Sequence, residues 1–315
     1  MPGRFQARKY RFTKDADTKW LLGSNMSLGT LDVAREFRKS NSAPDLYTIT
    51  WKNEVDINVR ASSDQNSCEI TASALLSTGL FLLTDFENCS VKLVDVTTHT
   101  VTSRIELPGE PWDVCVLPDD QAAVTLPDKS MIQLLSTQGG QLSFEKEIKV
   151  SSGCRGIAYC NNRLYVSYVY KPSIEVMTLG GHIISTFQTD DGRPLFQNPQ
   201  YLTVSATTPP TIYVSDYNAH AVLQLSLDGK ILREYRNEKV RNPASIVEVG
   251  LGQLLVCWKG SHTVMLLTAR DGNLREILGH TDGLASPYSV SFCPHTHTIV
   301  VGMYENDSLK VFNAI

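Results

Sequence analysis

The sequence lacks any apolar run that could cross a membrane. A membrane-spanning helix needs about 18 or more consecutive apolar residues, whereas the longest apolar stretches here, such as Gly79–Leu83, have the length of a single β-strand. The segment Met1–Lys19 is polar and basic, and it has neither the apolar centre nor the small-residue cleavage site of a signal peptide. We therefore expect no contact with a membrane.

Cysteine pairs with metal-binding spacing are also missing. The seven cysteines are scattered: Cys68, Cys89, Cys115, Cys154, Cys160, Cys257 and Cys293. No CxxC or CxxH pair occurs, which argues against a zinc finger. Cys160, Cys257 and Cys293 lie within apolar, strand-like runs, where a free buried thiol is expected. This usage predicts a reducing compartment, the cytoplasm.

Positive charge is in short supply. The chain has 29 Lys and Arg residues against 33 Asp and Glu residues, a net charge of −4. A protein that coats nucleic acid needs a basic surface, so DNA binding is not expected, although one local basic patch is compatible with this balance.

Known catalytic motifs are absent as well. The sequence contains no GxSxG elbow, HExxH pair, P-loop or GxGxxG loop. From these absences we predict no catalytic residue, no metal, no cofactor and no enzymatic activity.

Helical periodicity is nearly absent. One short helix is expected, over Asp32–Lys39, within a polar region that we interpret as a partly disordered linker or tail over residues 1–52. From residue 53 to 315, short alternating apolar runs are separated by Gly, Pro, Asn and Asp. This pattern predicts an all-β domain built from many short antiparallel strands.

The apolar runs repeat. Six strand-like runs end at Asp85, Leu126, Tyr168, Asp216, Trp258 and Met303, at intervals of 41 to 48 residues. Each is followed by a second run, and most of these second runs lead through a polar or Gly-containing turn into a third, while another run, often opened by Pro, comes before. Four strands in each of six units predict a six-bladed β-propeller.

The last unit is one strand short. It ends at Ile315 after three strands, and the segment Glu54–Arg60 has the alternation of an outer strand. We therefore predict that Val55–Val59 completes the last blade and closes the ring, which removes exposed sheet edges.

The units resemble a known repeat. The runs Thr84-Asp85-Phe-Glu-Asn88 and Val-Ser-Asp216-Tyr-Asn-Ala-His220, the second leading to Asp-Gly229, resemble the NHL repeat over roughly residues 54–315. NHL repeats build the six-bladed propeller at the C-terminus of many tripartite-motif (TRIM-NHL) proteins. At the other strand ends, Leu126, Tyr168, Trp258 and Met303 stand where the repeat usually has Asp.

The resemblance implies a recognition role. The RING and B-box zinc modules and the coiled coil of TRIM proteins are missing, so the resemblance implies a substrate-selecting domain in the ubiquitin pathway, with any ligase activity in another region. We expect an isolated propeller of this kind to be monomeric.

One rim of the propeller gathers aromatic and basic residues. The loops between second and third strands, and those between blades, open on the same rim. The residues expected to bind a ligand there are Trp112, Arg155, Tyr170, Lys171, Tyr201, Tyr217, Lys259, Tyr288 and Tyr304. Aromatic side chains with Arg and Lys stack bases or grip peptides. The alternative is that Trp112, Tyr201 and Tyr288 pack under the rim as core and that the lysines are ordinary surface charges.

Asp85 and Asp216 admit two interpretations. A carboxylate at a strand end accepts backbone N–H groups and braces a loop, which is the interpretation that we favour. Six-bladed lactonases instead hold an axial Ca²⁺ with carboxylates from several blades, but calcium takes six to eight oxygens and the other four strand ends carry no carboxylate.

These patterns lead to one predicted function and two alternatives. We expect a non-enzymatic module that binds a protein or peptide partner on the aromatic rim. The first alternative is single-stranded RNA on the same rim, and the remote one is a calcium-dependent lactonase.

Overall fold

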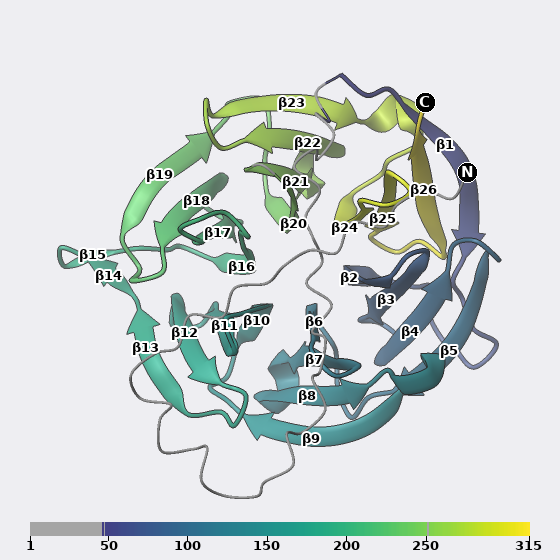
Figure 1. Ribbon diagram of the computed structural model, residues 1–315, viewed down its shortest axis with the longest axis horizontal. Coiled ribbons are helices and arrows are strands. Elements are labelled where there is room, and N and C mark those ends of the chain that lie inside the picture. Colours follow the sequence, from purple (N-terminus) through teal and green to yellow (C-terminus); the bar gives the residue numbers. More distant parts are fainter. Residues whose placement is uncertain (1–45, 47, 251) are drawn as a thin grey trace, which may run out of the picture. The chain divides into compact units, whose positions relative to one another are not determined.

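The computed structural model describes residue 46 and residues 48–250 and 252–315. The chain separates into two units, residues 1–41 and 42–315, and the first unit, with the expected helix over Asp32–Lys39, lies outside the described residues. The second unit contains six four-stranded antiparallel sheets arranged as blades in a ring, as Figure 1 shows. The prediction of an all-β, six-bladed propeller is therefore confirmed.

The blades follow one another along the chain. Blade 1 comprises β2 (Ile70–Ser77), β3 (Leu80–Asp85), β4 (Ser90–Asp95) and β5 (Thr100–Glu106); blade 2 comprises β6 (Val114–Leu117), β7 (Gln121–Leu126), β8 (Met131–Ser136) and β9 (Ser143–Lys149); blade 3 comprises β10 (Cys154–Cys160), β11 (Arg163–Tyr168), β12 (Ser173–Thr178) and β13 (Ile183–Phe187).

The second half of the ring has the same plan. Blade 4 comprises β16 (Pro199–Val204), β17 (Thr211–Asp216), β18 (Ala221–Ser226) and β19 (Ile231–Arg236); blade 5 comprises β20 (Pro243–Gly250), β21 (Gln253–Trp258), β22 (Thr263–Thr268) and β23 (Asn273–Leu278); blade 6 comprises β24 (Pro287–Cys293), β25 (Thr298–Met303), β26 (Ser308–Ala314) and β1 (Trp51–Asn58). A two-stranded hairpin, β14 (Thr189–Asp190) and β15 (Arg193–Pro194), joins blades 3 and 4, and the short helices are η3 (Pro127–Lys129), η4 (Gln138–Gly140), η5 (Lys259–Ser261) and η6 (His280–Asp282).

Burial explains the pattern of the apolar runs. The second strands β17, β21 and β25 are buried along their whole length, because the blades on either side cover both of their faces. The outer strands β9 and β19 are mostly exposed and carry charged residues. The inner strands β2, β6, β10, β16, β20 and β24 surround the axis in Figure 1, and neighbouring inner strands contact one another.

The inner strands are irregular near their starts. The pairing register shifts between Ile70 and Ala72, between Cys154 and Ile157, and between Pro199 and Tyr201, with similar shifts in β20 and β24. Such bulges re-aim side chains. In β10 the bulge carries Gly156, where a Cβ atom would lie 2.7 Å from the Cα of Tyr201, so only glycine allows β10 and β16 to approach this closely.

The ring closes as predicted. Strand β1 pairs antiparallel with β26, with Ile57 opposite Leu309, and completes blade 6. The strand begins at Trp51, earlier than the predicted Val55, and the Trp51 ring lies edge-on to Phe292 with 6.4 Å between ring centroids. Residues 1–45 and 47 of the expected tail lie outside the described residues, while Leu46 is buried and its N–H donates to Gln253 Oε1.

All seven cysteines are free thiols. Cys257 and Cys293 are buried as expected, but the expectation for Cys160 is wrong, because it lies half-buried at the end of β10.

If β1 closes the ring, a buried residue of this strand should matter more than an exposed one. We expect Ile57→Ala to lower the free energy of unfolding by about 2–5 kcal/mol, since it leaves a cavity in the β1–β26 seam. Lys52→Ala on the exposed side of the same strand should change it by less than about 0.5 kcal/mol. Urea unfolding of both variants measures the difference, and equal losses would contradict this role for β1.

Candidate functional site

The candidate site lies on the loop face, which we define as the face that carries the loops between second and third strands and the connections between blades. Three aromatic residues meet there at the axis: Trp112, which lies two residues before β6 of blade 2, Tyr201 in β16 of blade 4 and Tyr288 in β24 of blade 6. Their ring centroids lie 5.7–6.3 Å apart in all three pairs. We call these three buried residues the aromatic layer.

A hydrogen bond across the axis fixes the aromatic layer. The Tyr201 hydroxyl donates to the Thr71 carbonyl at 3.0 Å, which joins blade 4 to blade 1. Burial raises the pKa of Tyr201 well above its usual value, and Tyr288 and Asp113 add to the effect. Tyr201 is therefore a neutral donor throughout the physiological pH range.

Arg155 lies on the aromatic layer. The β10 bulge places its guanidinium carbon 3.5 Å from the Trp112 ring centroid, a cation–π contact. Its Nε and Nη1 atoms are buried and have no hydrogen-bond partner in the described part of the chain. The guanidinium is thus held by a ring face and keeps N–H donors uncommitted.

Lys259 is held in the same way from blade 5. Helix η5 places its Nζ 4.2 Å from the Tyr288 ring centroid and 4.0 Å from that of Tyr304. Across residues 46, 48–250 and 252–315, Lys259 forms no ion pair. Burial lowers the pKa of Lys259, and the negative charges of Glu69 and Glu305 oppose that effect.

Glu69 is the carboxylic acid with the largest electrostatic effect on Lys259. It precedes β2 and is 5% exposed. Its N–H donates to Asp85 Oδ1 at 3.0 Å and its carbonyl accepts the Phe86 N–H at 2.9 Å, so the backbone is fixed on both sides. Burial raises the pKa of Glu69 to about 7, an effect that Lys259 opposes and that Glu87, Glu305 and Asp85 strengthen. Near neutral pH, this group can either donate or accept a proton.

These residues define one feature, which we call the loop-face mouth: Glu69, Trp112, Arg155, Tyr201, Lys259, Tyr288 and Tyr304. Six of its seven members are among the rim residues expected from the sequence. Trp112, Tyr201 and Tyr288 form the floor as buried core, and Tyr304 is 38% exposed.

The remaining expected rim residues lie elsewhere on the loop face. Tyr170 is 73% exposed, and neither it nor the exposed Lys171 makes a ring contact or ion pair with the loop-face mouth. Tyr217 is half-buried, and its carbonyl accepts a hydrogen bond from Asn242.

Sequence reasoning missed Glu69. Its position directly before the first inner strand is the available signal, because the other mouth residues Trp112, Arg155, Tyr201 and Tyr288 also lie within two residues of the start of an inner strand.

Asp85 and Asp216 act as braces. The two carboxylate oxygens of Asp216 accept the N–H groups of Gln197 and Asn198 at 2.7 and 2.8 Å, and Oδ1 also accepts that of Ala219. The chief donors therefore lie in the connection before the blade as well as in the loop after the strand. The Asp216 oxygens are thus bonded to backbone N–H groups, and those of Asp85 are bonded to the Glu69 N–H and to Lys92 Nζ. Neither carboxylate is therefore available for an axial calcium ion.

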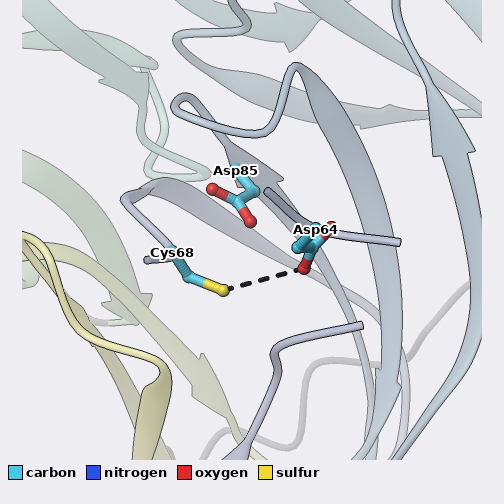
Figure 2. Close-up of side chains that lie close together, drawn as sticks. All are labelled: Asp64, Cys68 and Asp85. Atoms are coloured by element: carbon cyan, nitrogen blue, oxygen red, sulfur yellow. Dashed lines mark hydrogen bonds between the residues drawn. The ribbon is translucent and has the colours of Figure 1, made fainter. Parts of the chain in front are cut away.

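Three side chains of blade 1 and its leading segment have the spacing of metal ligands. Figure 2 shows Asp64, Cys68 and Asp85 pointing toward a common centre, with the Cys68 thiol 3.9 Å from Asp64. Lys92 occupies that centre: its Nζ lies 2.5 Å from Asp64, 2.6 Å from Asp85 and 3.3 Å from Cys68 Sγ. We call these four residues the Lys92 cluster.

The Lys92 cluster is a buried ion network. Lys92, Asp64 and Asp85 have fully buried side chains, and Arg104 Nε donates to Asp64 Oδ1 at 3.0 Å. Burial opposes the charge on Lys92, but the two carboxylates outweigh burial and raise the pKa of its ammonium. Because Asp64 belongs to the segment between β1 and β2, the cluster ties the closing strand to blade 1.

Comparison with known proteins supports the fold. No protein-family model and no curated protein matches the chain, so the NHL or TRIM identity suggested by the repeats is not shown. Among solved structures, a streptogramin B lyase has a TM-score of 0.60 at 13% identity, covering 86% of this chain and 100% of that one.

Two further structures are similar. A catalytically inactive virginiamycin B lyase from Staphylococcus aureus with quinupristin has a TM-score of 0.60 at 14% identity, covering 84% of this chain and 100% of that one. A protein of unknown function from Bacteroides thetaiotaomicron has a TM-score of 0.65 at 12% identity, covering 85% of this chain and 76% of that one. At these identities the likeness shows the β-propeller fold alone.

The comparison overturns our prediction that the chain is not an enzyme. The solved structures with this architecture include lyases, so the lack of familiar catalytic motifs does not exclude catalysis in a propeller of this kind. In the residues that the structure describes, no helix is long and apolar enough to cross a membrane.

Removing the central cation of the Lys92 cluster should destabilise the fold strongly. Lys92→Met leaves two buried carboxylates without their shared ammonium, and we expect it to cost about 3–5 kcal/mol of unfolding free energy. Lys230→Met, which removes an exposed partner of Asp228, should cost less than about 1 kcal/mol. Chemical denaturation of both variants compares them, and a Lys92→Met loss as small as the control would rule out this role.

Glu69 should make stability depend on pH. Its raised pKa means that the folded protein keeps a proton that the unfolded chain releases between about pH 4.5 and 7, so the free energy of unfolding falls as the pH rises through this window. Glu69→Gln should remove up to about 3 kcal/mol of that fall.

The matched control is Glu238→Gln, an exposed glutamate that is not among the residues acting on Glu69, which should keep the wild-type fall. Unfolding free energies at about pH 5 and about pH 8 measure the effect. An unchanged pH dependence in Glu69→Gln would show that the Glu69 carboxyl titrates normally.

Proposed function

We propose that the loop-face mouth binds a single acidic group of a protein or peptide partner. The observation that carries this proposal is that Arg155 and Lys259 are held by aromatic ring faces, at 3.5 Å from Trp112 and at 4.0 Å from Tyr304, and not by carboxylates. A cation held in this way keeps its N–H donors for an incoming anion, and hydrogen bonds between charged groups are among the stronger ones in proteins.

Burial favours an anion at this place. The partly buried cations are poorly solvated, as the lowered pKa of Lys259 indicates. Glu69 supplies less than a full negative charge near neutral pH, because its pKa is about 7. An entering carboxylate would therefore complete the charge balance at the loop-face mouth.

The surroundings favour one acidic group over a polyanion. Glu87 and Glu305 are exposed near the loop-face mouth and act on Glu69 electrostatically. A ligand with charges all along its length, such as RNA, would meet these carboxylates, whereas an acidic side chain flanked by neutral residues would not. The partly exposed ring of Tyr304 offers contact area for the flanking residues.

A matched pair of peptide pools tests the proposal. Fluorescence anisotropy would compare labelled random hexapeptides that carry one fixed Asp with pools that carry Asn at that position. We expect the Asp pool to bind at least about 10-fold more tightly, and Arg155→Met and Lys259→Met to remove this preference.

Lys171→Met is the control, because Lys171 is exposed on the same face but outside the loop-face mouth. It should bind like the wild type. Equal binding of the Asp and Asn pools, or equal loss in Lys171→Met, would refute the proposal. Tight binding of a random single-stranded RNA pool that weakens steeply with salt would favour RNA instead.

We also propose that the protein selects substrates in a reducing compartment. The resemblance of the repeats around Asp85 and Asp216 to NHL repeats supports a substrate-selecting role of the TRIM kind, and the seven free thiols support a reducing compartment such as the cytoplasm.

A second candidate is a lyase-type reaction at the same mouth. Glu69, with its pKa near 7 and the ammonium group of Lys259 close enough to act on it, has the properties of a proton acceptor, and the similar structures include lyases. Incubation with quinupristin tests this candidate: a change in its chromatographic retention that Glu69→Gln abolishes would support it, and unaltered quinupristin would remove it for this substrate.

A further inference from the structure

A cavity lies along the propeller axis beneath the aromatic layer. It has a volume of about 280 Å³ and is lined by residues of all six inner strands. Tyr201 of the aromatic layer lines it on the loop-face side. Its other end is formed by the half-buried Val116, Tyr159, Val204 and Val247, which lie toward the opposite face. Access is therefore from the face opposite to the loop-face mouth.

Asp113 lines the covered end of the cavity. It is 8% exposed, and its two carboxylate oxygens accept the N–H groups of Val114 at 2.9 Å and Ile157 at 2.8 Å. No Lys or Arg of the described ranges pairs with it: the nearby Arg155 lies over Trp112 instead. A buried carboxylate without a cation is costly, and burial raises the pKa of Asp113 to about 7.

The rest of the lining is neutral and rich in hydroxyl groups. Ser73 and Ser291 share a hydrogen bond of 2.8 Å between their hydroxyls, and Ser245 and Thr203 lie on neighbouring strands. The Cys115 thiol beside Asp113 stays neutral because burial raises its pKa. The cavity thus combines one carboxyl group, which is mostly ionised only above about pH 7, with several hydroxyl acceptors.

We propose that the axial cavity binds a small primary ammonium compound whose ammonium group pairs with Asp113. An ammonium group offers three N–H donors, which match the Asp113 carboxylate and the hydroxyl groups of the same lining. A divalent metal fits poorly, since calcium needs six to eight oxygen ligands and the cavity supplies one carboxylate that already accepts two N–H groups. The 280 Å³ volume limits the ligand to a small molecule.

Thermal unfolding of the full chain with ethylammonium chloride tests this site. At pH 8, where Asp113 is mostly ionised, saturating ethylammonium should raise the midpoint by about 2–4 °C over sodium chloride at equal ionic strength. Tetramethylammonium chloride, which has the charge but no N–H donor, should give no such rise. Titration calorimetry with ethylammonium provides the affinity.

Two variants and one control variant separate the site from a general effect of salt. Asp113→Asn removes the charge and should weaken ethylammonium binding at least about 10-fold. Val247→Trp narrows the open end, leaves Asp113 intact and should also abolish the rise, whereas Asp119→Asn on the surface should leave it unchanged. An equal rise with sodium or tetramethylammonium, or an undiminished rise in Val247→Trp, would overturn the proposal.

Discussion

The closed ring depends on the buried ammonium group of Lys92. A propeller is a sheet ring with one seam, and here the seam is the pairing of β1 with β26. The segment that leads from β1 into blade 1 carries Asp64, and Lys92 binds Asp64 and Asp85 together at 2.5 and 2.6 Å. Such a network stabilises only while complete, since the loss of one partner leaves an uncompensated buried charge.

The Lys92 cluster also positions the loop-face mouth. Asp85, held by Lys92 through one oxygen, accepts the N–H of Glu69 through the other. The Tyr201 hydroxyl of blade 4 reaches across the axis to the carbonyl of Thr71 in blade 1, the blade that contains Asp85. A ring that opened at its seam would therefore move Glu69 and the aromatic layer as well. The geometry of the loop-face mouth thus depends on closure of the ring.

Much of the fold follows from the repeat period in the sequence, because strand ends every 41 to 48 residues and one missing outer strand leave few arrangements. The sequence also predicts which residues lie on the rim, since the propeller topology places the inter-blade loops on one face. The ring contacts at the axis cannot be predicted from the repeat. Tyr201 lies two residues after Pro199, whereas Tyr288 directly follows Pro287, and only the bulges in β16 and β24 bring both rings to the axis. Lys92 and Asp113 read as ordinary strand and loop residues, because a buried charge is defined by neighbours remote in sequence.

NMR of the Arg155 side chain tests our proposal that Arg155 keeps N–H donors for an acidic ligand. The Nε–Hε signal of Arg155 in arginine-labelled protein would be followed during titration with N-acetyl-aspartate amide and, separately, with N-acetyl-asparagine amide. We expect the Arg155 signal to shift with the aspartate compound alone. An Arg155 signal that neither compound moves, or that both move equally, would refute the proposed site for an acidic group.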